Sequence, residues 1–469
     1  MGKSGAEFGR LAGCRKVGGE GRGHGPFINS LLKALRLLAT APIWTGGEGQ
    51  RWALWSLVVS HLSPYFQSPQ FRISAPRFAS TWVFATRLIM IVRNLKLKNW
   101  RNFREADVPF ADTTYLLGAN ASGKSNLLDV FRFLRDVSKT QGGGLQKAIA
   151  DRGGISKLRC LHARREPEVR IELEIEDGDT KWNYTLAFKP EGKGAQRIII
   201  SKEEVRKNGK PIINRPDAGD KRDETRLTQT HLEQIQANAD FRDLAEFFGE
   251  TTYLHLVPQL LKFGDRIGGH ILDDDPFGQG FLERIARATN RSRESRLQKI
   301  GKALQAAVPQ FEELAFEQDA INGRPHLKAR YKHHRPHAGW QREDQFSDGT
   351  LRLLGLLWSL LDGSSLLLLE EPELSLNDAI VRQIPLMLER VQRQNKRRRQ
   401  TIITTHSEAL LSNEGIDSSG ILLIESGANG STVRKLLEEE TKTISDGFSV
   451  AEVALPVTRP RTAEQLGFW

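Results

Sequence analysis

Cysteine and long apolar runs are the two features that this 469-residue sequence lacks most clearly. Its two cysteines, Cys14 and Cys160, are too few for a disulfide framework or a cysteine-based zinc site, so we expect a reducing, cytoplasmic environment. No apolar run approaches the roughly 18 to 20 residues that span a bilayer. The best candidate, residues 81–92, is short and carries Arg87. The sequence therefore predicts a cytoplasmic chain without a membrane segment.

Acidic residues are scarce at the N-terminus, where residues 1–89 contain no Asp. This stretch holds eleven Lys and Arg against three Glu, so it carries +8 of the +11 net charge and leaves +3 for the rest. Because the remainder is nearly balanced, bulk charge is weak evidence for a nucleic-acid partner. The stretch also lacks a sustained hydrophobic period, whereas residues 91–97 alternate as a strand does. We expect the folded protein to begin near Met90, and residues 1–89 to be a disordered extension, a wrongly assigned start or, alternatively, a transit peptide.

Two α/β-type stretches flank a different middle part. Residues 90–165 read as strand, turn, strand, glycine-rich loop and helix, and the same alternation returns over residues 345–469. Between them, residues 166–344 begin with period-two strands and continue with mainly helical patterns. We therefore predict an α/β fold of two lobes, 90–165 and 345–469, separated by an insertion with an antiparallel β lobe and a helical part.

Residues 118–125, Gly-Ala-Asn-Ala-Ser-Gly-Lys-Ser, match the P-loop pattern G-x-x-x-x-G-K-S. An apolar strand pattern precedes them and an apolar helix pattern follows, which is the context that this motif requires. Glycines let backbone N–H groups close on phosphates at a helix N-terminus. In this interpretation Lys124 neutralises the β- and γ-phosphates of ATP, and the Ser125 hydroxyl binds Mg²⁺. The alternative is a chance glycine-rich turn, against which the flanking elements argue.

A second motif consists of an apolar strand, residues 366–369, followed by Glu370 and Glu371. Acids at the C-terminal end of such a strand stand where ligands bind in open α/β sheets. We assign Glu370 to the Mg²⁺ shell and Glu371 to the polarisation of the attacking water. Without a P-loop, a solvated strand end would be the better interpretation. Together with one, the pair predicts a Walker B motif.

Two further segments complete the predicted site. Ser347, Asp348 and Gly349 precede an apolar helix, and Ser347 or Asp348 can serve simply as its N-cap. The functional interpretation adds that this helix end faces the γ-phosphate of ATP bound to another copy. His406 follows a predicted strand at 401–405; a lone histidine there is usually an ordinary one, but here we expect it to hydrogen-bond the γ-phosphate.

The order of these motifs resembles the ABC-ATPase heads related to RecF and SMC proteins. It is most similar to the compact AAA-family ATPases grouped with the OLD and AbiEii phage-defence proteins. Residues 98–103, Lys-Asn-Trp-Arg-Asn-Phe, resemble the Lys-Asn-Phe-Arg-Ser-Phe opening of those proteins. The resemblance covers 90–135 and 345–426 and is vague between 140 and 340. The chain departs from the family pattern at a Walker B acid, a signature glycine and a histidine position, which here are Glu370, Asp348 and Asn377.

The resemblance implies a P-loop NTPase with the ABC-ATPase head fold, whose heads form a homodimer around ATP and Mg²⁺. The nucleotide-binding residues it implies are Gly118, Asn120, Gly123, Lys124, Ser125, Asn126, Arg101, Ser347 and Gly349. It implies Ser125 and Glu370 as metal ligands, and Glu371 and His406 as catalytic residues. The sequence does not assign a Q-loop residue, although Gln141 is a candidate.

The resemblance further implies an ATP-driven switch in DNA maintenance or phage defence, with DNA as a possible partner. An ATP-sensing scaffold that gates a separately encoded effector is the alternative. A transporter ATPase subunit is less favoured, because Lys124 and Ser347 lie far apart for a compact transporter subunit and no membrane segment is present. The basic run 396–399 is read as a solvated loop or, alternatively, a phosphate contact. The histidine cluster at 333–337 is read as a surface loop rather than a metal site.

Overall fold

A computed structural model describes residues 90–163, 165–192, 197–267, 275, 277–332, 339–394 and 399–458. The predicted N-terminal extension, the histidine cluster and the basic residues 396–398 lie outside these residues. Within the described part of the chain, no helix is both long and apolar enough to cross a membrane.

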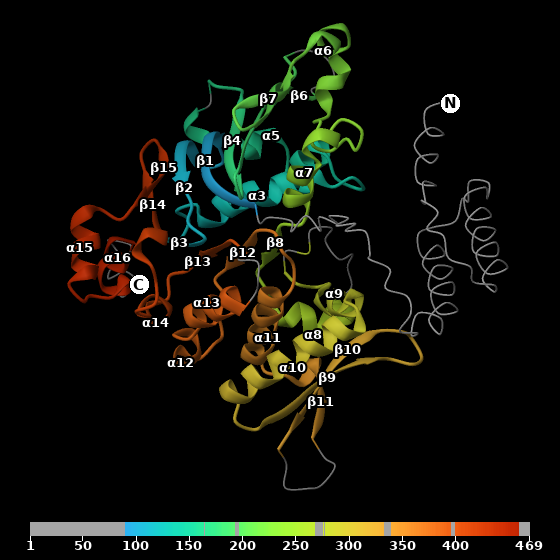
Figure 1. Cartoon of the computed structure of the whole chain (residues 1–469), viewed down its shortest axis with the longest axis vertical. Helices are drawn as coiled ribbons and strands as arrows, with labels where there is room; N and C mark the ends of the chain where they lie inside the picture. Colours follow the sequence, from blue (N-terminus) through green and yellow to red (C-terminus); the bar gives the residue numbers. More distant parts are fainter. Residues whose placement is uncertain are drawn as a thin grey trace, which may run out of the picture. The chain divides into compact units, whose positions relative to one another are not determined.

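An antiparallel sheet of six strands, in the order β2-β1-β4-β5-β6-β7, forms one layer (Figure 1). The strands are β1 (Met90–Trp100), β2 (Phe103–Pro109), β4 (Val169–Asp177), β5 (Thr180–Pro190), β6 (Ile198–Lys207) and β7 (Lys210–Arg215). Burial along β4 alternates, so that the apolar side chains of Val169, Ile171 and Leu173 share the buried face. Because β1 pairs with β4 along its length, this sheet joins strands from both sides of the predicted boundary at 165/166.

A second six-stranded sheet has the order β15-β14-β3-β13-β12-β8. Its members are β3 (Thr113–Gly118), β8 (Thr252–Leu254), β12 (Leu367–Glu370), β13 (Thr401–Thr404), β14 (Ile421–Gly427) and β15 (Gly430–Lys435). The five strands from β14 to β8 are parallel, and β15 is an antiparallel edge. Parallel strands are buried on both faces, which explains the continuous apolar run of the Walker B strand.

Helix α3 (Lys124–Ser138) lies between the two sheets. Its apolar side chains share one hydrophobic core with the antiparallel sheet and with Leu116, Leu368 and Ile402 of the parallel sheet. The alternate residues of those parallel strands belong to a second core, which they form with α11 (Asp348–Leu361). The P-loop is therefore fixed at the junction of two packed layers.

The middle part of the chain was predicted to be mainly helical beyond its first strands, and the structure adds strands to it. Strand β8 comes from this part and completes the edge of the parallel sheet beside β12. A small antiparallel sheet has the order β11-β10-β9, formed by β9 (Phe311–Gln318), β10 (Pro325–Tyr331) and β11 (Trp340–Arg342). Three residues of β8 are too few to show a period of two, which is why the sequence pattern did not reveal it.

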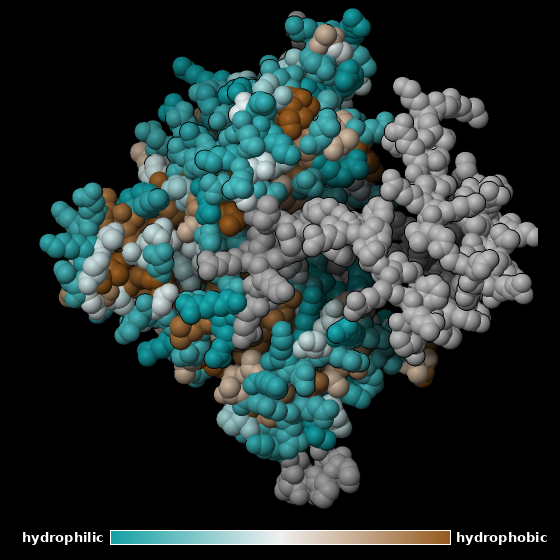
Figure 2. All heavy atoms as spheres, viewed as in Figure 1, coloured by the Kyte–Doolittle hydropathy of each residue, from teal (hydrophilic) through white to brown (hydrophobic). Residues whose placement is uncertain are grey.

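The remaining helices are α4 (Leu145–Asp151), α5 (Ile155–Leu158), α6 (Ala218–Arg222), α7 (Arg242–Gly249), α8 (Pro258–Ile267), α9 (Phe281–Arg287), α10 (Asn290–Ala307), α12 (Asp378–Val381), α13 (Ile384–Gln394), α14 (Glu408–Leu411), α15 (Glu438–Ser445) and α16 (Val450–Thr458). Short 3-10 turns lie at Leu161–Ala163, Glu224–Thr228, Ala239–Phe241, Glu343–Gln345 and Ser418–Gly420. The viewed face is mainly hydrophilic, with hydrophobic side chains gathered around α15 and α16 (Figure 2). Leu437 and Phe448, which flank α15, are more than half exposed.

Candidate functional site

The P-loop connects the end of β3 to the start of α3, and two of its glycines are required by close contacts. Gly123 precedes the helix with φ of 113°, a conformation that favours glycine. A Cβ atom on Gly123 would lie 2.1 Å from the Asn102 amide nitrogen, and one on Gly118 would lie 2.7 Å from the carbonyl oxygen of Ile424. The loop can therefore take this shape only with glycine at both positions.

Asn102, which the sequence analysis did not select, holds the P-loop in place. Its side-chain amide donates to the carbonyl oxygen of Ser122 and to the Ser431 hydroxyl, both at 2.7 Å. Its side-chain oxygen accepts a hydrogen bond of 2.8 Å from Asn126 at the start of α3. Asn102 thus links the loop, the helix and β15. The one signal in the sequence was its place in the quoted motif at 98–103.

Replacing Asn102 by alanine should loosen the P-loop without unfolding the protein. The change removes the three side-chain hydrogen bonds, and we expect residues 118–125 to open more often, by about 1 to 3 kcal/mol in local opening free energy. Amide hydrogen exchange followed by mass spectrometry measures this directly. Asn214→Ala, at an exposed position of β7, is the matched control. Unchanged protection of residues 118–125 in the Asn102 variant would show that the clamp is not needed.

The Lys124 side chain folds back over the P-loop. Its ammonium donates to the carbonyl oxygens of Gly118 at 2.8 Å and Ala119 at 3.2 Å. Burial lowers the pKa of Lys124, although nearby carboxylates oppose this shift. The ammonium is therefore a desolvated cation at the mouth of the loop, beside backbone groups that it can exchange for stronger anionic partners.

The Glu370 carboxylate is held at both of its oxygens. The Ser125 hydroxyl donates to one oxygen and the Tyr253 hydroxyl donates to the other. Tyr253 reaches Glu370 because β8 pairs in parallel with β12, so that Tyr253 lies opposite Leu368. Burial and the adjacent Glu370 raise the pKa of Tyr253, so it remains a protonated donor. The structure thus brings together the two predicted metal ligands and adds Tyr253, which sequence reasoning missed.

Glu371 and His406 leave neighbouring parallel strands and meet at the C-terminal edge of the sheet. The Nδ1 atom of His406 lies 3.3 Å from the Glu371 carboxylate. The Glu371 backbone has φ of 45°, an uncommon value for a residue with a side chain, and its N–H donates to the Thr404 carbonyl oxygen at 3.0 Å. This conformation turns the side chain out of the strand direction. A further acid, Glu373, is buried and accepts a hydrogen bond of 2.6 Å from the Thr405 hydroxyl.

Ser347 is exposed and caps α11, where its hydroxyl oxygen accepts a hydrogen bond of 3.1 Å from the Thr350 N–H. The adjoining Asp348 is bound by Lys262 of α8 at 2.6 Å. A Cβ atom on Gly349 would lie 2.7 Å from the Ser375 carbonyl oxygen, so that position also needs glycine. The N-terminus of α11 contacts α8 and the segment after β12. Within the described residues, the hydrogen bonds of Ser347 and Asp348 go to these neighbours and to α11 itself, and not to the P-loop of the same chain.

The remaining predicted residues lie at different distances from the P-loop. Asn120 is exposed at its tip. The Asn126 carbonyl oxygen accepts a hydrogen bond of 2.8 Å from the Trp100 indole. The Arg101 guanidinium is bound by Asp129 of α3 at 2.6 Å, so its contact with nucleotide stays a prediction. Gln141 follows the C-terminal end of α3, roughly 20 Å along the helix from Lys124 by the rise per residue, and so is remote from the loop.

Taken together, these groups form a set suited to a metal–triphosphate. Backbone N–H groups at the start of a helix and a desolvated ammonium favour phosphate oxygens. The hydroxyl of Ser125 and the carboxylate of Glu370 are hard oxygen ligands, which Mg²⁺ prefers. Glu371 directly follows Glu370 in the chain, and its partly buried carboxylate pairs with His406. The residues present therefore fit Mg²⁺ and ATP.

Comparisons with known proteins identify a family for this chain. A family model described as "AAA domain, putative AbiEii toxin, Type IV TA system" matches residues 114–412, more than half of the chain. The chain is 26% identical over 119 residues to the DNA replication and repair protein RecF of Agathobacter rectalis, covering 25% of this chain and 29% of that protein. It is 30% identical over 87 residues to the RecF protein of Synechocystis, covering 18% and 23%. The match thus spans less than a third of these relatives.

Among solved structures, the chain is similar to an SMC head bound to the C-terminal winged-helix domain of ScpA. That match has 16% sequence identity and a TM-score of 0.45, and it covers 75% of this chain and 99% of the other.

Proposed function

Because the chain belongs to the AbiEii-type AAA-domain family whose model it matches, we propose that it binds Mg²⁺ and ATP at residues 118–125 and hydrolyses ATP. Membership in this AAA-domain family and the P-loop at residues 118–125 support an ATPase with an ABC-type head. The proposal goes further and assigns the reaction to particular side chains. The observation that carries it is the Glu370 carboxylate, held by Ser125 from the P-loop helix and adjoined by Glu371.

Phosphate binding follows from the backbone N–H groups at the N-terminus of α3 and from Lys124. The β- and γ-phosphates would replace the Gly118 and Ala119 carbonyl oxygens as partners of the ammonium, because an anionic acceptor binds it more strongly. Ser125 and Glu370 would hold Mg²⁺, which supplies charge neutralisation of the phosphates. The hydrogen bond between Ser125 and Glu370 keeps the hydroxyl and carboxylate oxygens adjacent, so binding Mg²⁺ would need little rearrangement of these side chains.

Glu371 is proposed as the group that orients and activates the attacking water. Its carboxylate lies at the end of the strand, one residue beyond the metal ligand, where an in-line water on the γ-phosphate would stand. His406, 3.3 Å from that carboxylate, is placed to hold its orientation and to donate to a γ-phosphate oxygen. Both groups come from the rigid C-terminal edge of the parallel sheet, which preserves their mutual position.

The site is proposed to be completed by a second copy. Ser347 is exposed at the positive end of α11, the kind of helix end that binds anions, and in this chain its hydrogen-bonding partners belong to its own helix. A second copy whose Ser347 approached the γ-phosphate would close two ATP molecules between two heads. Binding would then favour the closed dimer and hydrolysis would reopen it, which is the behaviour of a switch.

For the biological role we propose an ATP-driven switch in DNA maintenance or phage defence, with DNA as a possible partner. A scaffold that senses ATP and gates a separate effector uses the same site and is the second candidate. Both candidate functions predict that ATP hydrolysis by this protein requires Mg²⁺. ATP turnover by the full chain, measured as phosphate release with Mg²⁺ and with EDTA, tests the shared premise, and equal rates in the two conditions would contradict it.

Tyr253→Phe should weaken Mg²⁺ binding without abolishing hydrolysis. The variant keeps the ring but loses the donor that orients Glu370, and removal of a group that orients a metal ligand costs about 10- to 100-fold in metal affinity. We therefore expect the Mg²⁺ concentration that gives half-maximal hydrolysis to rise by about that factor, measured by titration at saturating ATP. Tyr331→Phe, on β10, is the matched control. An unchanged titration curve would remove Tyr253 from the site.

A further inference from the structure

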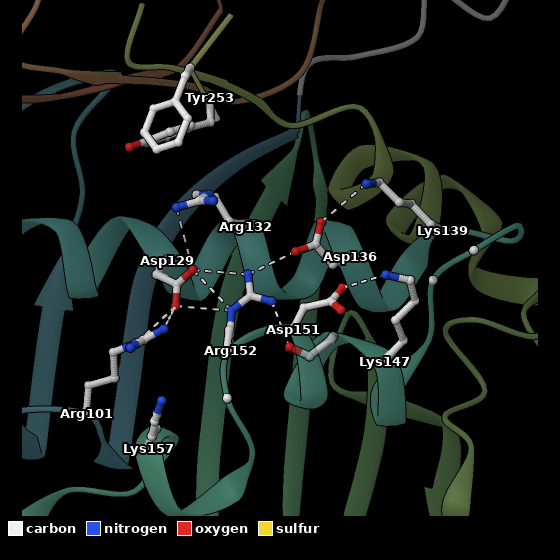
Figure 3. Close-up of a pocket in the computed structure, with 15 residues that line it drawn as sticks. Arg101, Asp129, Arg132, Asp136, Lys139, Lys147, Asp151, Arg152, Lys157 and Tyr253 are labelled. Atoms are coloured by element: carbon white, nitrogen blue, oxygen red, sulfur yellow. Dashed lines mark hydrogen bonds and ion pairs between the residues drawn. The ribbon is translucent and has the colours of Figure 1, made fainter. Parts of the chain in front are cut away.

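A cavity of about 640 Å³ runs along α3 on the side that faces α4 (Figure 3). Its walls come from α3, from the loop at 142–143, from α4 and the turn after it, and from four further residues, Arg101, Lys157, Tyr253 and Phe277. Residues 118–125 do not contribute to this lining. The cavity is therefore distinct from the P-loop. Its volume lies within the roughly 300 to 1,000 Å³ that small-molecule sites occupy.

Basic side chains dominate the lining. The cations are Arg101, Arg132, Lys139, Lys147, Arg152 and Lys157, and the carboxylates are Asp129, Asp136 and Asp151. The cavity therefore carries an excess of three positive charges. Such an excess within low-dielectric walls concentrates anions.

The carboxylates serve to fix the arginines in place. Arg152 is only 7% exposed and binds Asp129 at 3.0 Å and Asp136 at 2.9 Å, while its guanidinium also donates to the Ala148 carbonyl oxygen. Figure 3 shows the Arg101, Arg132 and Arg152 side chains converging on Asp129. Burial opposes ionisation of Asp129, but these arginines outweigh it and lower its pKa. The cations are thus held rigidly, which lowers the entropic cost of binding an anion.

The lysines and an aromatic ring complete the cavity. Lys147 and Asp151 form an exposed ion pair. The Lys157 side chain packs against Gly153. The Arg132 guanidinium stacks on the Tyr253 ring with 4.4 Å to its centroid. An arginine stacked on an aromatic face is a surface to which planar, phosphate-bearing molecules bind well.

We propose that this cavity binds a phosphate-bearing small molecule of nucleotide size. The rigid arginines and the lysines would receive its phosphate groups, and the Arg132–Tyr253 stack would adjoin its planar part. A cavity of this volume suits one nucleotide better than a nucleic-acid duplex.

A ligand bound in this cavity would also affect the neighbouring catalytic site, and this step rests on the proposed function. Tyr253 presents its ring to the cavity and its hydroxyl to Glu370. A ligand that restrains the ring also restrains the donor that orients the metal ligand. The cavity is in this sense a regulatory site for ATP hydrolysis.

The test measures binding of inorganic pyrophosphate and AMP by calorimetry to the full chain carrying Lys124→Ala, in which the P-loop is disabled. Both probes should bind. Adding Lys147→Glu and Lys157→Glu should weaken binding by about tenfold or more, the scale of one lost hydrogen bond to a charged partner. Lys221→Glu with Lys435→Glu applies the same charge change at exposed positions elsewhere and should leave binding unchanged.

Three results would overturn the proposal: no binding of either probe to the Lys124→Ala chain, equal losses in the cavity variant and the control, or binding of a single-stranded oligonucleotide but of neither probe. The last result would make the surface a nucleic-acid contact. ATP hydrolysis by the chain with an intact P-loop is assayed separately. Probe binding without hydrolysis would retain the cavity site and remove the proposed function, whereas hydrolysis without probe binding would do the reverse.

Discussion

Replacing Glu371 by glutamine should lower ATP hydrolysis by about two to four orders of magnitude, the usual scale for loss of a general base. Glutamine keeps the size of the side chain and its hydrogen-bonding capacity but cannot accept the proton of the attacking water. The metal ligand Glu370 and the P-loop are untouched, so Mg²⁺ and ATP should still bind. Phosphate release and nucleotide binding, measured on the same preparation, separate these two effects.

The same variant should report on assembly. If hydrolysis reopens the dimer, blocking it should trap the closed form, and the protein should elute as a larger species with ATP than without. Glu389→Gln, an exposed glutamate paired with Arg393 on α13, is the matched control and should behave as the unmodified chain does. A Glu371→Gln protein that hydrolyses ATP at the original rate would exclude Glu371 as the base. One that elutes at the same volume in both conditions would argue against an ATP-closed dimer.

The second large effect is expected for Lys124→Ala and Ser347→Arg, each of which should abolish hydrolysis for a different reason. Lys124→Ala removes the phosphate-facing cation from the P-loop and should abolish ATP binding or turnover. Ser347→Arg places bulk and charge on the exposed cap of α11, the helix end proposed to approach the other copy's γ-phosphate. The second variant should therefore bind ATP but fail to close.

Mixing the two inactive proteins should restore activity. In a mixed dimer, one site combines the intact Lys124 of one copy with the intact Ser347 of the other, so about one working site per dimer should reappear. Phosphate release from the mixture, compared with each protein alone, measures this. Ser445→Arg, an exposed position on α15, is the control for the added arginine and should leave hydrolysis intact. A mixture as inactive as its parts would mean that ATP is hydrolysed within one chain.

The parts of the site that the sequence predicted are those whose residues lie close together along the chain. The P-loop and the Walker B strand are each continuous, and their flanking apolar patterns indicate the strand and the helix on which they lie. The α/β fold with its antiparallel lobe followed from the same periodicities, and the structure confirms that fold class with one antiparallel sheet and one mainly parallel sheet. The roles of individual side chains stay predictions until the variants are measured.

The parts that the sequence did not reveal depend on contacts between distant segments. Tyr253 lies in a three-residue strand, and only its pairing with β12 brings it to Glu370. Asn102 appears in a motif, but its partner Ser431 is 329 residues further along the chain. Arg101 binds Asp129, a pairing that the sequence pattern did not indicate, and its predicted contact with nucleotide stays a prediction. Local propensity cannot encode such pairings, because tertiary packing decides them.

The hydrogen bonds of Asn102 to the P-loop and to Ser431 also affect the order in which the protein folds during synthesis. Ser431, which donates to the Ser122 carbonyl oxygen and accepts from Asn102, lies near the end of the described chain. Closing a loop of that length costs little extra entropy, but contacts of such high sequence separation form slowly. A ribosome-bound chain has made its P-loop long before β15 emerges to secure it. The P-loop is thus secured only after residue 431 has been translated, so nascent chains that stop before it carry the motif without this support.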